Sequence, residues 1–191
     1  LLHESLYDEV VERIRERVAA IRVGDPLDPA SGMGPVNSEP HHRRILDIIA
    51  SAKTQGATVI NGGGCPAGKQ FEHGFWVEPT VFGDVTMDMR VAREEIFGPV
   101  LAVLKWRTVD EAIAMANELD LGLTAAVWTN DLKAAMRTVR ALQSGLVWVN
   151  GTGRHYLGTG FSGWKNSGLG REECLEEVLS YTRVKAVHII Q

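Results

Sequence analysis

The sequence predicts an α/β fold in which a mainly parallel sheet is flanked by helices. Residues 100–104 form a continuous apolar run, which is typical of a buried strand. Apolar residues recur at helical spacing over residues 6–21 and again over 132–142, with charged residues between them. Strand-like and helix-like stretches alternate along most of the chain, and this order favours a sheet with helices on its faces.

Length and composition are those of an ordinary globular protein. The chain has 191 residues, 45% hydrophobic and 23% charged, which is enough to bury a substantial core. A net charge of -4 without a lysine-arginine block argues against a nucleic-acid partner. No apolar run is long enough to span a membrane, and no signal peptide is recognised. Cys65 and Cys174 lie far apart without metal-ligand spacing, so we expect a cytoplasmic protein with no metal site.

Two amphipathic helices are expected in the first third of the chain. The first covers residues 6–21 and ends before the Gly24-Asp25-Pro26 turn. The second begins near Asn37 or Ser38, either of which can cap it, and ends at Gly56.

Shorter strands and helices are expected along the rest of the chain. Pro79 places its strand at a sheet edge or at a bulge, because proline cannot donate to a ladder. Thr108 opens a capping box, and Asn130 caps a later helix. The expected strands cover 58–60, 75–82, 100–106, 124–128, 145–150 and 186–190, and the expected helices cover 88–93, 108–116, 130–142 and a short segment that starts at 171.

Two glycine-rich stretches match the spacing of nucleotide-binding motifs. Residues 63–69 have the spacing of a P-loop, but Gln70 replaces the hydroxyl residue that would bind magnesium, and no helix follows. Residues 158–163 fit a dinucleotide fingerprint, but the strand before it and the helix after it are missing. We reject both motifs and interpret the second as a mobile loop that faces the substrate.

The acidic stretch before the strand at 100–104 has properties suited to binding a nucleotide sugar. Glu94 and Glu95 are followed directly by Ile96, Phe97, Gly98 and Pro99. An ionised carboxylate can accept hydrogen bonds from two neighbouring sugar hydroxyls, and Phe97 can offer a ring face to a planar heterocycle. The alternative interpretation is a solvated acidic pair in front of a strand.

Residues 94–100 resemble the Glu-Glu-Ile-Phe-Gly-Pro signature of the NAD(P)-dependent aldehyde dehydrogenase superfamily. The resemblance extends from residue 7 to residue 182, and further motifs follow in the family's order at 74–81, 120–129, 145–150 and 165–172. It implies the α/β fold of the family's catalytic domain and a C-terminal strand that joins an intersubunit sheet, hence a homodimer or homotetramer. We therefore expect a partial catalytic domain over 1–160, and an active-site loop, short helix and oligomerisation strand over 161–191.

The resemblance also implies residues that bind the cofactor, NAD or NADP. Glu95 would hold the nicotinamide ribose, and Phe97 would pack near the nicotinamide ring. His41 and Arg44 fall where the family places residues near the adenosine ribose. Positive charge at a helix N-terminus opposes the helix dipole, which singles this cluster out, although a solvated basic face is the alternative.

The substrate residues implied by the resemblance lie in the last third of the chain. Phe161 takes the place of the aromatic residue that lines the family's aldehyde funnel. Tyr156 and Trp164 are further candidates for its wall, with packing as the alternative for each. Gly160 stands for the family's proline and Ser162 for its first glycine, and these departures affect how the loop is placed.

The reaction implied by the resemblance is oxidation of a small-molecule aldehyde to a carboxylic acid. A cysteine thiolate attacks the carbonyl, hydride leaves to the nicotinamide, and a water activated by a glutamate hydrolyses the thioester. The family's nucleophile is expected shortly before Leu1 and its general base further upstream, so we expect a fragment that is inactive alone. Two alternatives remain: a coenzyme A-acylating relative, and a binding or assembly module without activity. The aldehyde and the choice between NAD and NADP are left open.

Overall fold

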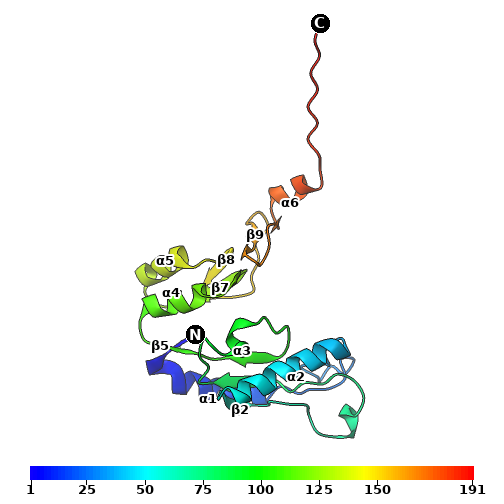
Figure 1. Ribbon diagram of the computed structural model, residues 1–191, viewed down its shortest axis with the longest axis vertical. Coiled ribbons are helices and arrows are strands. Elements are labelled where there is room, and N and C mark those ends of the chain that lie inside the picture. The colour runs from blue at the N-terminus through cyan, green and yellow to red at the C-terminus, as the bar shows by residue number, and fades with distance from the viewer. The chain divides into compact units, whose positions relative to one another are not determined.

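The computed structural model describes all 191 residues, which form two compact units (Figure 1). Unit 1 is Leu1–Thr108 and unit 2 is Val109–Gln191. This boundary lies earlier in the chain than the one expected between residues 160 and 161. The alternation of strands and helices is present in both units. None of the helices has the length and apolar character that crossing a membrane requires.

A three-stranded sheet lies at the centre of unit 1, in the order β2-β3-β4. Its strands are β2 (Thr58–Asn61), β3 (Thr80–Gly83) and β4 (Val100–Ala102). β3 pairs antiparallel with β2 and parallel with β4, and all four of its residues are buried. The edge position expected from Pro79 is therefore wrong. Pro79 lies one residue before β3, where its missing N–H removes no ladder bond, and the ladder's irregularity falls in β2.

Helices complete unit 1. They are α1 (Tyr7–Ala19), α2 (Glu39–Thr54) and α3 (Arg90–Arg93), with 3-10 turns at Glu4–Leu6 and Lys69–Phe71. The apolar side of α2 buries Ile45, Ile48, Ile49 and Ala52, as its helical spacing predicted. α1 buries Tyr7, which packs in one cluster with Val81 of the sheet. Ser38 occupies the N-cap position of α2, but its side chain makes no capping hydrogen bond.

The strand expected over 100–106 is divided in two. After β4 the chain continues into β5 (Lys105–Trp106), which pairs parallel with β1 (Leu2–His3) instead of with the central sheet. Val103 and Leu104, between the two strands, are buried. The predicted burial of the apolar run holds for these two residues only, because Leu101 in β4 is 45% exposed and its two neighbours are partly buried.

Unit 2 is built on the parallel pair β7 (Thr124–Val127) and β8 (Leu146–Val149). α5 (Leu132–Ala141) contacts both β7 and α4 (Val109–Asn117), and Figure 1 shows these elements together. Two short antiparallel pairs follow, and their strands are β6 (Leu121–Gly122) with β10 (Trp164–Lys165), and β9 (Phe161–Ser162) with β11 (Arg171–Glu172). The last helix is α6 (Leu175–Ser180).

Two expectations for unit 2 are wrong. Asp131, not Asn130, caps α5, because its side chain accepts hydrogen bonds from the N–H groups of Lys133 and Ala134 at 2.8 and 3.1 Å. Residues 171–172 form β11 instead of opening a helix. Residues 186–190, expected to form a terminal strand that joins a sheet with another subunit, are exposed and pair with no strand of this chain.

Candidate functional site

The acidic motif forms a loop that joins α3 to β4. Glu94 is the C-cap residue of α3, and the chain enters β4 at Val100. Between them, Phe97 adopts a left-handed backbone conformation with φ of 52°, which residues other than glycine rarely adopt. The residue is 75% exposed. A large apolar side chain in this position is therefore accessible to a ligand.

The two adjacent glutamates have different surroundings. Glu94 accepts a 2.5 Å hydrogen bond from Arg90 Nε and lies 3.5 Å from Arg44 Nη2. Arg90 also pairs with Asp47 of α2. The hydrogen bond from Arg90, reinforced by the charges of Arg90 and Arg44, lowers the pKa of Glu94. Glu95 is exposed and forms no ion pair, so its carboxylate is available to an external donor.

His41 and Arg44 both hydrogen-bond the main chain of this loop. His41 Nε2 donates to the carbonyl oxygen of Phe97 at 2.6 Å. Arg44 donates from Nη2 to the carbonyl of Glu95 at 2.6 Å and from Nη1 to that of Ile96 at 3.1 Å. Positions three apart on a helix share one face, which brings the two side chains together. His41 and Arg44 therefore bind the main chain of the loop and do not form only a solvated basic face.

A pocket of about 430 Å³ lies beside the loop and is lined by Val36, Asn37, His41, Arg44 and Phe97. Three of the four residues predicted to bind the cofactor thus line one pocket. The fourth, Glu95, is close in sequence but is not among the lining residues. The volume falls within the range of about 300–1,000 Å³ that is common for ligand sites.

Gly98 explains how the loop approaches α2 so closely. A Cβ atom at this position would lie 2.6 Å from Cδ1 of Ile45, a side chain with no exposed surface. The next residue, Pro99, accepts a 2.8 Å hydrogen bond from the N–H of Thr80 in β3. The loop is therefore fixed to the core of unit 1 on two sides.

The predicted substrate residues all lie in unit 2, and only one of them joins a cluster of rings. Phe161 in β9 is partly buried and packs edge-on against His155, with ring centroids 5.1 Å apart. His155 in turn packs against Trp148 and hydrogen-bonds the carboxylate of Glu173 at 3.0 Å. Tyr156 and Trp164 are largely exposed and take no part in this stack.

Sequence reasoning did not identify His155, Trp148, Arg90 or Asp47 as neighbours of the predicted site residues. Their contacts depend on which strands pair and on how α3 meets α2. Neither arrangement has a local sequence signal.

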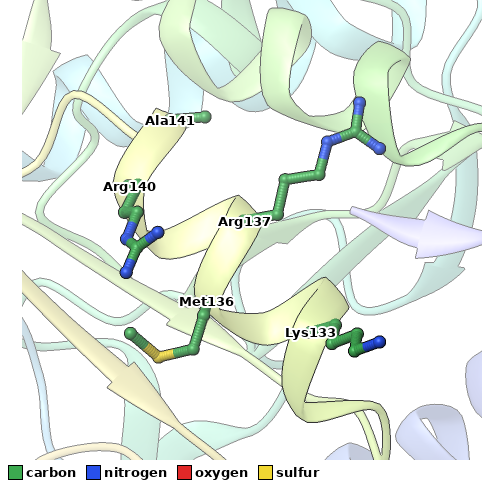
Figure 2. Close-up of a pocket in the computed structure, with 5 residues that line it drawn as sticks. All are labelled: Lys133, Met136, Arg137, Arg140 and Ala141. Atoms are coloured by element: carbon green, nitrogen blue, oxygen red, sulfur yellow. The ribbon is translucent and has the colours of Figure 1, made fainter.

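A second pocket, of about 480 Å³, lies along α5 and is lined by Lys133, Met136, Arg137, Arg140 and Ala141. Figure 2 shows that its long side chains leave the helix in different directions and do not converge on one point. Arg137 is engaged by Asp110 of α4. None of the predicted site residues lines this hollow, so the pocket beside the acidic motif is the better candidate.

Neither cysteine lines either pocket. Cys65 Sγ lies 3.6 Å from His42 Nε2, but that nitrogen is also 2.9 Å from the carbonyl oxygen of Trp76. Burial, together with the nearby charge of Glu78, raises the pKa of the Cys65 thiol, which disfavours the nucleophilic thiolate. Cys174 is the N-cap residue of α6. No cluster of three or more His, Cys, Asp or Glu side chains is arranged to hold a metal ion.

Known proteins of one family match this chain over nearly its whole length. The model of the aldehyde dehydrogenase family matches residues 1–187. The chain belongs to the aldehyde dehydrogenase family. Aldehyde dehydrogenase tropH of Talaromyces stipitatus is 45% identical over 192 residues, and betaine aldehyde dehydrogenase of Brucella anthropi is 41% identical over 188.

Each of these alignments covers 98% of this chain but only 37% and 39%, respectively, of the relative. The chain therefore spans less than half the length of the aldehyde dehydrogenases that it matches. Among solved structures, betaine aldehyde dehydrogenase of Staphylococcus aureus in complex with NAD+ superposes with a TM-score of 0.89 at 35% identity, over 94% of this chain and 36% of that one. The predicted fold class, that of the family's catalytic domain, is confirmed.

Proposed function

We propose that this chain supplies cofactor and substrate residues to an enzyme that oxidises an aldehyde to a carboxylic acid with NAD+ or NADP+. The observation that carries the proposal is the different use of two adjacent carboxylates. Glu94 is held by Arg90 and Arg44, while Glu95 remains exposed and unpaired beside a pocket. A structural acidic pair would engage both side chains.

The residues around this pocket suit the ribosyl-nicotinamide part of a dinucleotide. Glu95 is an acceptor for two ribose hydroxyls, because an ionised carboxylate only accepts hydrogen bonds. Phe97 offers an exposed ring to the nicotinamide. His41 and Arg44 hydrogen-bond the same loop, so we propose them at this half of the cofactor instead of near the adenosine ribose. When bound, NAD(P)+ accepts the hydride from the substrate. The residues of this chain bind and orient it.

For the substrate we propose an aldehyde that contacts Phe161, with Tyr156 and Trp164 as neighbouring wall residues. The ring stack behind Phe161 supports this role, since His155 and Trp148 restrict how the phenyl ring can turn. Neither cysteine of this chain suits the covalent step, because neither lines the pocket and the pKa of Cys65 is raised. The thioester is proposed to form on a cysteine outside these 191 residues.

We further propose a cytoplasmic homodimer or homotetramer. Residues 186–190 are apolar, extended and exposed, and they would gain ladder hydrogen bonds by pairing with another subunit. Both cysteines are free thiols, as a reducing compartment favours.

The test compares Glu95→Gln with Glu94→Gln in the full-length enzyme. A hydrogen bond to a charged group contributes about 1.5–3 kcal/mol, so Glu95→Gln should weaken NAD+ binding by about 10- to 150-fold without lowering the melting temperature. Glu94→Gln should lower the melting temperature, because it releases Arg90 and Arg44. Calorimetric NAD+ titration and thermal unfolding measure the two effects. Unchanged NAD+ affinity in Glu95→Gln would contradict the assigned role.

A further inference from the structure

We propose that Arg44 and His41 are positioning residues, which hold the main chain of residues 95–97 in its binding shape before any cofactor is present. The consequence for catalysis rests on the proposed function. The hydrogen bonds that hold the loop belong to this chain, and their effect can be tested without cofactor.

Three consecutive carbonyl groups are the basis of this inference. The carbonyls of Glu95, Ile96 and Phe97 each accept a hydrogen bond from a side chain of α2. Residues 95–97 belong to no helix or strand, so no regular backbone pairing satisfies these oxygens. Arg44 and His41 supply the partners that secondary structure supplies elsewhere.

The backbone of Phe97 shows why such partners are needed. A φ of 52° is unfavourable for a phenylalanine and persists only where the surroundings hold it. The 2.6 Å bond from His41 Nε2 is made to the carbonyl of this same residue. Without it and the two bonds from Arg44, the loop would relax to a more favourable conformation and carry the Phe97 ring and the Glu95 carboxylate with it.

The guanidinium of Arg44 is itself oriented from a second direction. Its Nη2 atom lies 3.5 Å from the Glu94 carboxylate, which Arg90 fixes in turn. A planar fork that donates to two neighbouring carbonyls and also meets a carboxylate cannot be reproduced by the single ammonium of lysine. The charge and the geometry of Arg44 can therefore be separated by substitution.

Arg43 provides a matched control on the same helix. It is one residue away and carries the same side chain, but it is largely exposed and pairs with Glu39 of its own helix. Arg43→Met removes the same cationic group without touching the loop. Met is a good helix former, so both arginine substitutions leave the propensity of α2 nearly unchanged.

The experiment measures how often the loop opens in the 191-residue chain without cofactor. A glutamate-specific protease cleaves the Glu95–Ile96 bond only when the loop is released, and the exposed Glu72–His73 bond in the same unit serves as an internal reference. When opening and closing are fast, the cleavage rate follows the open population. The measured quantity is the ratio of the two cleavage rates.

Arg44→Met should raise this ratio by about 10-fold, Arg44→Lys by less, and Arg43→Met not at all, since a lost charge-assisted hydrogen bond corresponds to at least a tenfold change. His41→Leu, which removes the donor to Phe97, should raise the ratio independently and covers the case in which Arg44→Met fails to fold. A ratio that stays unchanged in Arg44→Met or His41→Leu overturns the proposal, as does an equal rise in Arg43→Met.

A second measurement separates this proposal from the proposed function. In the full-length enzyme, Arg44→Met should lower the affinity for NAD+, and Arg44→Lys should lower it less. The loss of affinity should thus follow the same order as the rise in the cleavage ratio. If Arg44→Met releases the loop but neither Arg44→Met nor Glu95→Gln weakens NAD+ binding, the positioning role of Arg44 is supported and the cofactor role of the loop is refuted.

Discussion

Gly98→Ala is the substitution for which the structure gives the sharpest expectation. The backbone of Gly98 is not left-handed, so alanine meets no conformational penalty there. The added Cβ would instead lie 2.6 Å from Cδ1 and 2.9 Å from Cγ1 of Ile45. Ile45 is fully buried on α2 and has little room to move, so either the loop or the helix must shift.

Overpacking of this kind destabilises a protein by about 1–3 kcal/mol. Ile45→Val removes the Cδ1 atom that makes the closest contact, and alone it should destabilise unit 1 by about 0.5–1.5 kcal/mol. In the double variant the two changes compensate in part, because the closest contact is removed while the 2.9 Å contact with Cγ1 remains. The double variant should therefore be more stable than the sum of the single effects by at least about 0.5 kcal/mol.

Hydrogen exchange of the amides in α2, followed by mass spectrometry, measures these effects within unit 1. A loss of 1–3 kcal/mol corresponds to exchange that is faster by about 5- to 150-fold. Exchange in unit 2, for example in α5, serves as the control and should not change. Strict additivity of Gly98→Ala and Ile45→Val, or an unaltered α2 in Gly98→Ala, would refute the close approach on which the site geometry depends.

Two further substitutions test the capping and electrostatics of the fold. Asp131→Ala should destabilise α5 by about 0.5–2 kcal/mol, whereas Asn130→Ala should change the stability of α5 by less than about 0.5 kcal/mol. Hydrogen exchange of the α5 amides distinguishes the two variants. Equal effects would contradict the observed cap. The pKa of Asp84 is lowered by hydrogen bonds from Lys105 and Thr58, so its stabilising effect is present above the ordinary carboxyl value of 3.8 and is lost as the pH falls through the lower folded-state value. Asp84→Asn should accordingly lower the melting temperature by less than about 5 °C at pH 7 and at pH 5. The difference in melting temperature between the variant and the original protein should shrink below pH 3.8. If that difference has already vanished at pH 5, the stabilising role assigned to the Asp84 carboxylate is contradicted.

The sequence predicts most reliably those elements whose signal is local. The helical spacing of Ile45, Ile48, Ile49 and Ala52 identifies both α2 and its buried side, and all four residues are buried. The apolar run at 100–104 predicts burial correctly for Val103 and Leu104 only, since Leu101 is 45% exposed. It could not show that the strand expected over 100–106 divides between two sheets, because strand pairing depends on partners about a hundred residues away.

Caps and long-range contacts were harder to predict for related reasons. Asn130 and Asp131 are adjacent residues of equally suitable type, and only the start of the helix decides between them. In the candidate site, the unfavourable charge of His41 and Arg44 at the start of α2 drew attention to both residues. Their actual partners, carbonyl groups 51 to 56 residues further along, have no side-chain identity that a sequence could reveal.

His41 and Arg44 hydrogen-bond residues 95–97 through peptide oxygens, so these three bonds do not depend on which side chains those residues carry. Residue 95 could therefore be substituted without loss of the hydrogen bond from Arg44, so the backbone of the motif stays fixed while its side chain changes. Residue 97 is more restricted: its positive φ admits glycine, asparagine, aspartate or histidine but excludes valine and isoleucine. The backbone conformation at this position therefore limits substitutions of Phe97 to a few residue types.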